Sequence, residues 1–367
     1  MKKVLMVDYY GTCNGEGKTI GHSPKVAREY RDLFLKTDQV DIAASPCVAN
    51  AVEGAGFGHI YRLPYNIVEA DYNRLSKRIT DKFKIWVNIH RVFQIPGYDL
   101  LWFYRVDFFF LLYMLFAGKT QGRRICLVYQ MGGGQGMLGK MIDWVYDRGI
   151  RKFDGVIYTQ ERMKVPVKHF LYMPDYWYRK EKYDRFAALP KEEKVVCLGA
   201  MNPYKKLEEL VDVFNELGYP LEIAGYFFDR KRADRLRQGA RDNIFIEDRI
   251  LEDAEYYEKL GSARYAVLPY DMDQYKNRTS GILLECAFLG VVPIAPEGLL
   301  RENGLAGIGY ASVKEIHEKI FQYSVSEILE VNREKVRKNF NEECIRNRFV
   351  EWMSCFDRSE EASKSRD

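Results

Sequence analysis

The sequence predicts an α/β protein of two Rossmann-like domains that face each other across a cleft, with C-terminal helices that cross back to the first domain. Three observations predict this class: a length of 367 residues, short apolar segments that alternate with segments of helical period, and a restart of that pattern near residue 194. Single cores stop growing at roughly 250 to 300 residues, and the alternation is typical of parallel sheets. The composition, 47% hydrophobic with 12 Pro and 28 Gly, excludes disordered and collagen-like chains.

In the first half, apolar β-branched runs predict strands at 3–7, 40–44, 59–63, 100–104, 125–129 and 155–158. A helix is expected over 24–35, because Ser23 can cap it and Pro24 suits its first turn, and another over 140–148. The run 108–117 falls short of the roughly 20 residues that a membrane span needs. We interpret it as a buried helix, with a surface that dips into a bilayer interface as the alternative.

The segment 181–193 is charged and has no clear period, so we expect it to be a linker. After it, expected strands at 194–199, 220–225, 244–247, 265–269 and 291–295 alternate with expected helices at 206–217, 229–238, 252–261 and 281–289. The stretch 313–355 is expected to be helical, and 356–367 to be a frayed polar tail. The predicted domains are therefore 1–180 and 194–335, followed by a crossover helix and tail at 336–367.

Charge is distributed unevenly along the chain. Residues 1–180 carry 27 Lys and Arg against 17 Asp and Glu, a net +10, and the remainder carries a net −6. The basic half is expected to face an anionic membrane surface, a phosphate-bearing substrate or nucleic acid, unless the imbalance is chance scatter. The seven cysteines have no C-x-x-C spacing, which disfavours zinc fingers and disulfide scaffolds and favours a reducing cytosol. The apolar run at 3–7 is too short for a signal peptide.

Three short patterns have weak support. Gly15-Glu16-Gly17-Lys18-Thr19 resembles the end of a phosphate-binding loop, but position 12 is Thr where that motif needs Gly. Asp271-Met272-Asp273 has a form that can hold a divalent metal, yet nothing nearby supplies further ligands, so we expect a solvated loop. The run 134–139 matches G-x-G-x-x-G, but after the fifth expected strand rather than the first. It leaves a nicotinamide-dependent oxidoreductase open, although we favour a flexible loop that lines the cleft.

The stretch 265–295 carries the strongest signal: a buried strand, a polar loop, a helix that begins near Thr279-Ser280-Gly281, and a second strand. Small residues at a helix start leave backbone N–H groups open, and the helix dipole favours an anion there. Glu285 lies one turn into this helix, where its carboxylate could accept two ribose hydroxyls. This pattern predicts a site for a nucleoside diphosphate.

Two motifs in this half resemble those of the GT-B glycosyltransferases, and among them glycosyltransferase family 4. They are Glu285-Cys286-Ala287 followed by Gly290-Val291-Val292-Pro293-Ile294, and Gly199-Ala200-Met201-Asn202-Pro203-Tyr204-Lys205-Lys206. The resemblance covers 194–300 well and the first half only in architecture. It implies that Lys205 contacts the donor diphosphate. Ala200 replaces the family's arginine, so Arg278 would supply that charge, and Asn277 stands where the family often has an earlier glutamate.

The resemblance implies a metal-independent hexosyltransferase without a cofactor, which moves a sugar from a nucleotide-sugar to a glycan or lipid-linked acceptor in surface polysaccharide or glycolipid synthesis. We expect 194–335 to bind the donor and 1–180 the acceptor, at the cytoplasmic face of an anionic membrane and without nucleic acid. A non-catalytic nucleotide-sugar or glycan-binding protein is a further alternative. The expected donor residues are Lys205, Arg278, Thr279, Ser280, Gly281 and Glu285; the candidate bases are Glu16 and His22; the acceptor or cleft loops contain Asn14, Gly15, Lys18, Gly132, Gly133 and Gly134.

Overall fold

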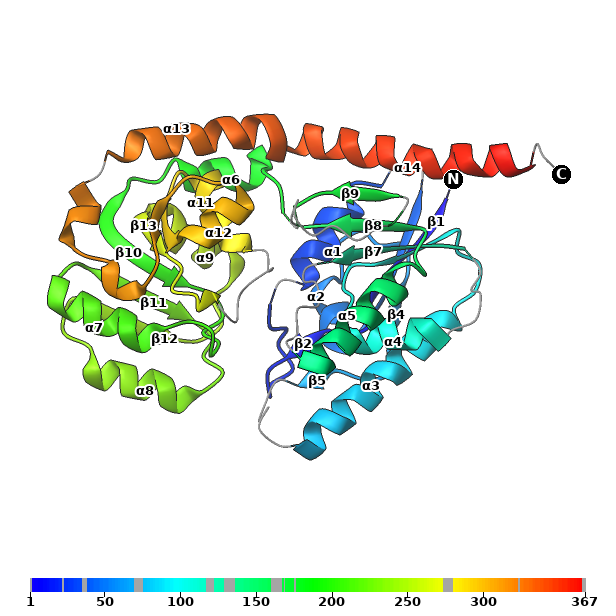
Figure 1. The fold of residues 1–367 in the computed structure, drawn as a ribbon, viewed down its shortest axis with the longest axis horizontal. Helices are drawn as coiled ribbons and strands as arrows, with labels where there is room; N and C mark the ends of the chain where they lie inside the picture. The colour runs from blue at the N-terminus through cyan, green and yellow to red at the C-terminus, as the bar shows by residue number, and fades with distance from the viewer. Residues whose placement is uncertain are drawn as a thin grey trace. The chain divides into compact units, whose positions relative to one another are not determined.

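The structure, a computed structural model, describes residues 2–21, 23–34, 38–68, 75–116, 122–128, 136–159, 167, 169–174, 176–272, 280–322 and 324–364. The chain forms two compact units: unit 1 is Met1–Asp175 with Arg346–Asp367, and unit 2 is Tyr176–Ile345 (Figure 1). Each unit has a central sheet of parallel strands covered by helices, which confirms the predicted α/β class. The unit boundaries differ from the predicted ones at 180 and 336.

Unit 1 contains a seven-stranded sheet in the order β4-β3-β1-β6-β7-β8-β9. These strands are β1 Lys3–Asp8, β3 Gln39–Ala44, β4 Ile60–Arg62, β6 Leu100–Phe103, β7 Arg123–Val128, β8 Gly155–Tyr158 and β9 Phe170–Tyr172. Two short strands, β2 Thr12–Cys13 and β5 Ile67–Val68, form a separate pair. The helices are α1 Ser23–Arg31, α2 Pro46–Ala51, α3 Leu75–Phe93, α4 Phe108–Phe116 and α5 Gly136–Ile150. The six predicted strands all appear, whereas α3 was not predicted.

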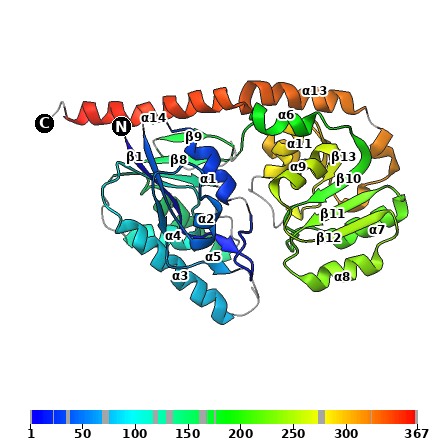
Figure 2. The same cartoon turned by 180° about the vertical axis from the view of Figure 1, so that it is seen from behind.

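Helices cover both faces of the unit 1 sheet. On one face, α3, α4 and α5 pack side chains such as Ile85, Phe110 and Val145 against alternate residues of the central strands. On the other face, Tyr30 of α1 stacks on Trp102 of β6 with ring centroids 4.5 Å apart. Figure 2 shows the unit from behind. The predicted helix is confirmed over Phe108–Phe116, where it buries Phe110, Leu111 and Met114, but Phe116 at its end is 83% exposed.

Unit 2 contains a six-stranded sheet in the order β12-β11-β10-β13-β14-β15. Its strands are β10 Glu192–Leu198, β11 Leu221–Gly225, β12 Ile244–Asp248, β13 Ala263–Val267, β14 Val292–Pro296 and β15 Ile308–Tyr310. Its helices are α6 Lys180–Ala187, α7 Leu207–Leu217, α8 Arg230–Gly239, α9 Asp253–Ser262, α11 Gly281–Leu289, α12 Glu297–Asn303 and α13 Val325–Lys335. Two 3₁₀ turns, Val313–Glu315 and Glu318–Gln322, precede α13, and a π-helical turn, Val336–Phe340, follows it.

The last helix, α14 Glu342–Lys364, begins in unit 2 and continues into unit 1. In unit 1, Phe349 packs edge-on against Phe34 with centroids 5.4 Å apart, and Arg346 Nη1 donates to Asp32 O at 2.9 Å. The predicted crossing back to the first domain is therefore confirmed. The tail predicted at 356–367 is wrong as far as Lys364, because this segment has no Gly or Pro to break the helix.

The segment predicted as a linker at 181–193 is packed into unit 2 instead. Two aromatic side chains three residues apart, Tyr183 and Phe186, share the buried face of α6. Tyr183 packs against Tyr257 and Phe288, with ring centroids 5.5 and 5.0 Å apart. Charge on the other face of this short helix concealed the apolar pair in the sequence.

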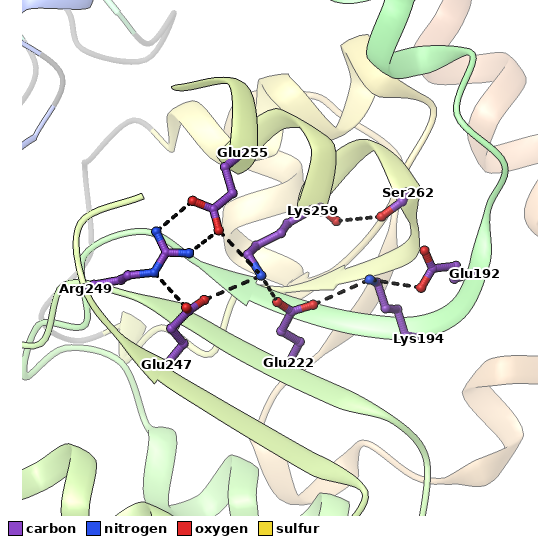
Figure 3. A network of polar contacts seen from close by, with 8 residues as sticks. All are labelled: Glu192, Lys194, Glu222, Glu247, Arg249, Glu255, Lys259 and Ser262. Atoms are coloured by element: carbon purple, nitrogen blue, oxygen red, sulfur yellow. Dashed lines mark hydrogen bonds and ion pairs between the residues drawn. The ribbon is translucent and has the colours of Figure 1, made fainter. Parts of the chain in front are cut away.

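One face of the unit 2 sheet is tied to α9 by charges (Figure 3). Glu222 of β11 and Glu247 of β12 point toward α9, and Lys259 of that helix binds both, at 2.5 and 3.5 Å. Arg249 joins Glu247, at 2.7 Å, to Glu255 of α9. Carboxylates that a helix covers lose contact with water, and a nearby cation offsets this cost in free energy. Here Lys259 of α9 and Arg249 at the end of β12 supply the cations.

Lys191, also in the predicted linker, caps two helices at once. Its ammonium donates to Gly261 O of α9 and to Leu289 O of α11, the second at 2.8 Å. Both acceptors lie in the last turn of a helix, where carbonyl groups lack intrahelical donors and a cation is favoured. Burial lowers the pKa of Lys191 to about 8.

This lowered pKa predicts a pH dependence of stability. The folded protein loses the Lys191 proton near pH 8, whereas the unfolded chain holds it up to an ordinary lysine pKa of 10.5. The free energy of unfolding of the wild type, relative to that of Lys191→Met, should therefore rise as the pH increases through this window. Chemical denaturation of both proteins at a series of pH values measures the difference. A difference that stays constant or falls contradicts the prediction.

Candidate functional site

The sheet of unit 2 changes its winding direction between β10 and β13. The chain passes from β10 to β11 on one side, and β13 pairs with the other side of β10. Ligands of open parallel sheets bind outside the carboxyl ends of the strands at such a switch point. The loops that follow the two strands are joined there: Lys206 N donates to Pro269 O at 2.7 Å, and Asp271 N to Tyr204 O at 2.8 Å. A ligand site of unit 2 is expected at this edge.

Two glycines allow the loops after β10 and β11 to run close together. Gly199 has φ +93° and Gly225 has φ +149°, both in the region that favours glycine. A Cβ on Gly225 would lie 1.9 Å from Gly199 O. Beyond this contact, Met201 N donates to Tyr226 O at 2.8 Å. This pairing directs the chain after β10 toward Lys205.

Lys205 is buried beneath its own loop. Its Nζ donates to Leu198 O at 2.9 Å and lies 3.6 Å from Met201 Sδ. Burial lowers the pKa of Lys205, and the nearby Arg232 charge acts in the same direction. These two contacts, within the described part of the chain, use two of the three ammonium N–H groups, so one remains for a ligand oxygen. The structure thus places the predicted lysine at the switch point with its charge only partly satisfied.

Arg232 of α8 fixes the loop that contains Lys205 through hydrogen bonds. Its Nη1 donates to Asn202 O at 3.0 Å, its Nη2 to Lys205 O at 2.7 Å, and its Nε to Glu208 Oε1 at 2.7 Å. The sequence analysis did not identify this residue. The only signal was a dense basic run, Arg230-Lys231-Arg232, that also fits a solvated helix face. Arg232 is a positioning residue for the loop.

The helix that follows β13 in the motif, α11, begins at Gly281 without a side-chain cap. Ser280 is 1% exposed, and its Oγ has no hydrogen-bond partner in the described residues. A buried hydroxyl without a partner is costly. Together with the N–H groups that a helix start leaves without intrahelical acceptors, it marks a place where a ligand oxygen would be stabilised.

Gly281 has a structural reason to be small in addition to the predicted one. A Cβ at this position would lie 2.3 Å from Cε2 of Tyr176. The glycine therefore makes room for a buried tyrosine ring of the same unit, not only for a ligand at the helix start.

Glu285 is buried, and it already accepts two hydroxyl hydrogen bonds. Tyr256 OH donates to its Oε2 at 2.6 Å, and Tyr257 OH to its Oε1 at 3.1 Å, both from α9. Burial and the Glu285 charge raise the pKa of Tyr256 well above its ordinary value, so the phenol keeps its proton. A carboxylate has about four acceptor positions. A ribose hydroxyl would share this carboxylate with the two phenols.

In unit 1, the predicted acceptor loop is a tight turn organised by Asn14. Its Oδ1 accepts from Glu16 N at 3.0 Å and from Lys18 N at 2.9 Å, and its N donates to Lys18 O at 2.8 Å. Asn14 is buried, whereas Gly15, Glu16 and Lys18 are exposed at the tip. Glu16 therefore projects from a turn rather than lying in a shielded position.

A second switch point lies between β1 and β6 of unit 1. Asp8 ends β1 there and is fully buried, with Oδ1 accepting from Tyr10 N at 3.0 Å. Burial raises the pKa of Asp8, although the Tyr10 N–H, the Arg105 charge and the hydroxyls of Tyr104 and Ser23 oppose the shift. Arg105 follows β6, and its guanidinium stacks 3.8 Å from the centre of the Tyr10 ring. Asp8 was not among the residues predicted from the sequence to be functional.

Several predicted residues lie outside the described part of the chain. They are His22, Gly132, Gly133, Gly134, Arg278 and Thr279, together with Asp273 of a weaker pattern and Asn277 of the family comparison. In the part that is described, His, Cys, Asp and Glu side chains form no group of three that could hold a metal ion. Metal independence stays a prediction.

No protein-family model matches the chain, and no curated protein matches it. Solved structures do match. AviGT4, a glycosyltransferase involved in avilamycin A biosynthesis, is 13% identical over 96% of this chain and 97% of its own, with a TM-score of 0.62. HepE of Anabaena, solved in complex with UDP-glucose, is 11% identical over 97% of this chain and 100% of its own, with a TM-score of 0.65.

The trehalose-6-phosphate synthase OtsA is 10% identical over 97% of this chain and 98% of its own, with a TM-score of 0.65. These proteins share the GT-B fold of glycosyltransferases, so this chain has that fold over nearly its full length. Its narrower resemblance to glycosyltransferase family 4 stays a prediction.

Proposed function

We propose that this GT-B protein is a glycosyltransferase that uses a nucleotide-activated sugar as its donor. One observation carries the proposal: the loop after β10, which holds the buried ammonium of Lys205, is hydrogen-bonded to the loop after β13, and the chain after β13 leads to the start of α11, where Ser280 Oγ has no partner among the described residues. Positive charge and open N–H groups at one sheet edge suit a diphosphate. HepE, of the same fold, has been solved with UDP-glucose bound, which supports a nucleotide-sugar donor here.

In the proposed reaction the bond between the sugar and the diphosphate breaks, and negative charge develops on the leaving phosphate. Lys205 and the first turn of α11 would stabilise this charge, and Arg232 would hold the Lys205 loop in place. Arg278 and Thr279 are proposed to add further donors. Fixed donors at the position where charge develops are an effective means of catalysis. The proposed enzyme is of hexosyltransferase type, with neither a metal nor a cofactor.

We propose that unit 1 receives the acceptor hydroxyl at its own switch point. Asp8 is a better candidate for general base than Glu16, because burial raises its pKa whereas Glu16 lies on an exposed turn. The proposed acceptor is a glycan or a lipid-diphosphate-linked sugar in polysaccharide or glycolipid synthesis. The proposed location is cytoplasmic, peripheral on an anionic membrane, without nucleic acid. No helix among the described residues has both the length and the apolar character to cross a bilayer.

A panel of nucleotide sugars tests the donor class. A bound donor raises the melting temperature by mass action, so one nucleotide sugar should shift the thermal transition of the full chain more than its free nucleoside does. Transfer to an acceptor, or slow hydrolysis of that donor alone, would then separate an enzyme from a non-catalytic binding protein. If no nucleotide sugar shifts the transition, the proposed function is wrong.

The Glu285 site gives a sharper prediction. Glu285→Gln should lower donor affinity about tenfold or more, because an amide presents one acceptor oxygen where the carboxylate presents two and carries no charge. Tyr256→Phe should leave donor affinity unchanged or raise it, because it frees Oε2 for a ribose hydroxyl. Calorimetric titration of each variant measures both effects. If Glu285→Gln lowers only the melting temperature, its carboxylate serves to hold α9 and not the donor.

A further inference from the structure

Large exposed apolar side chains concentrate on three neighbouring helices of unit 1. Among the described residues, seven side chains of this kind belong to α3, α4 and α5: Ile79, Phe83, Trp86, Phe116, Met137, Met141 and Trp144. The helices lie on the same face of the sheet, where α4 packs against both α3 and α5, and Figures 1 and 2 both show them side by side. We call the outward side of these helices the α3–α5 face.

The exposed residues form a stripe on each of two helices. On α3 they are Ile79, Phe83 and Trp86, and on α5 they are Met137, Met141 and Trp144. Both sets have the i, i+4, i+7 spacing of a single helix side. The core is packed by other positions of the same helices, such as Ile85, Ile89 and Val145. Each helix therefore has a second apolar side that the fold of unit 1 does not bury.

Phe83 is 67% exposed and Trp144 is 54% exposed, so half or more of each side chain meets water. Contiguous exposed apolar surface of this kind marks an interaction site. Trp86 is held in place, because its indole Nε1 donates to Phe109 O of α4 at 3.3 Å. The aromatic rings are thus presented outward by packed helices rather than by loops.

The charges on the α3–α5 face are mostly positive. Exposed side chains at Arg91, Lys140 and Arg148 lie on the two striped helices. On the described side chains of α3 and α5, the exposed carboxylates are those of Asp143 and of Asp147, whose side chain is 44% exposed and pairs with Arg151. Lys82 adds a cation whose Nζ lies 4.2 Å from the centre of the Phe109 ring. Aromatic and aliphatic groups interspersed with cations complement an anionic phospholipid surface, which offers phosphates at the level of the headgroups and hydrocarbon beneath them.

We propose that the α3–α5 face is the membrane-docking surface of the protein, and that it inserts Phe83, Trp144 and their apolar neighbours into the interface of an anionic phospholipid bilayer. The two stripes lie on helices of one layer, with α4 packed between them, and a planar bilayer can contact more than one helix of such a layer. The proposal rests on the proposed function in one respect: docking brings unit 1, as acceptor unit, to a lipid-linked acceptor. The proposal also assigns the membrane contact to α3 and α5. The alternative predicted from the sequence placed that contact at 108–117.

Vesicle flotation of the full chain tests the proposal. Wild type should float with vesicles of phosphatidylcholine and phosphatidylglycerol at low salt, and bind vesicles of phosphatidylcholine alone much more weakly. Phe83→Gln/Trp144→Gln should lower the vesicle affinity at least about tenfold, because two partly inserted aromatic side chains are lost. Phe245→Gln is the matched control, since Phe245 is 58% exposed but lies on β12 of unit 2. It should bind vesicles as wild type does.

Intrinsic fluorescence supplies a second readout. The protein has five tryptophans; Trp102, Trp177 and Trp352 are buried, whereas Trp86 and Trp144 are 42% and 54% exposed. Anionic vesicles should therefore shift the emission to the blue, and spin-labelled lipids should quench it. Trp144→Gln should reduce both changes, while the emission of the buried tryptophans persists.

Three results would overturn the proposal: no binding of wild type to anionic vesicles at low salt, binding of Phe83→Gln/Trp144→Gln as tight as wild type, or a concentration-dependent dimer that the same double substitution abolishes. The last result would assign the face to a second copy of the chain. Calorimetric titration with the nucleotide-sugar donor, in the absence of vesicles, reports on the proposed function alone. Failure of docking is therefore distinguishable from failure of donor binding.

Discussion

Asp8→Asn is expected to lower kcat/KM for sugar transfer about a hundredfold or more, within the range that a general base contributes, while donor affinity stays unchanged. Asparagine has nearly the same shape as aspartate but cannot take a proton from the acceptor hydroxyl. The proposed donor residues lie in unit 2, which has its own core, so the substitution leaves them intact. Steady-state kinetics with a donor from the thermal screen, and calorimetry with the same donor, measure the two quantities.

The pH profile distinguishes this role from a structural one. A base acts only when deprotonated, and burial raises the pKa of Asp8, so kcat/KM of wild type should fall as the pH is lowered, at a pH above that of an ordinary aspartate. This acid limb should be absent from Asp8→Asn.

Asp41→Asn is the matched control. Asp41 is a buried acid in the middle of β3, where it accepts from Tyr98 OH at 2.6 Å and His59 N at 2.8 Å. Its substitution should lower the melting temperature but not the rate per folded molecule. If Asp8→Asn behaves like Asp41→Asn, Asp8 is not the base.

Lys205→Met is expected to weaken donor binding about tenfold to a hundredfold, because a hydrogen bond to a charged group contributes about 1.5 to 3 kcal/mol. Methionine fills similar space and has no charge. Burial lowers the pKa of Lys205, so its ammonium loses its proton at a lower pH than an exposed lysine would. The donor affinity of wild type should accordingly decrease as the pH rises, and the affinity of the variant should not share this decrease.

Lys206→Met is the control for Lys205→Met. Lys206 is the next residue of the same loop, and its Nζ lies 4.0 Å from Glu209 Oε1, so its charge is directed to α7. Calorimetric titration of both variants at several pH values, with circular dichroism as a check of folding, completes the test. A larger effect of Lys206→Met than of Lys205→Met would remove Lys205 from the site.

The sequence was sufficient to predict which edge of the unit 2 sheet carries the proposed donor residues. Apolar runs mark β10 and β13, and the polar residues after each run must lie at the carboxyl edge of a parallel sheet, which predicts the helix start at Ser280. Lys205 was predicted from its resemblance to the glycosyltransferase motif. The partners that surround these residues depend on tertiary packing. Tyr256 and Tyr257 reach Glu285 from a different helix, and nothing in the local pattern near Glu285 indicates them.

The errors have related causes. The segment 181–193 was predicted as a linker because its charges outnumber its apolar residues, although two aromatic side chains are enough to fix a helix of two turns. Helix α3 was not predicted, because its second apolar stripe obscures the usual contrast between a polar and an apolar side. Asp8 was not predicted as a functional residue. An acid at a strand end belongs to a ligand site only if the strand lies at a switch point, and that depends on the strand order of the whole sheet.

The path of the chain through the two units has a consequence for biosynthesis. Unit 2 is continuous from Tyr176 to Ile345, whereas unit 1 is closed by residues from Arg346 onward. On the ribosome, unit 2 is therefore complete before Phe349 emerges to pack against Phe34. Until then, the apolar side chains of unit 1 that pack against α14 lack these contacts. The nascent unit 1 thus depends on the last stretch of translation, and a chain that stops at 345 would carry a complete unit 2 and an unfinished unit 1.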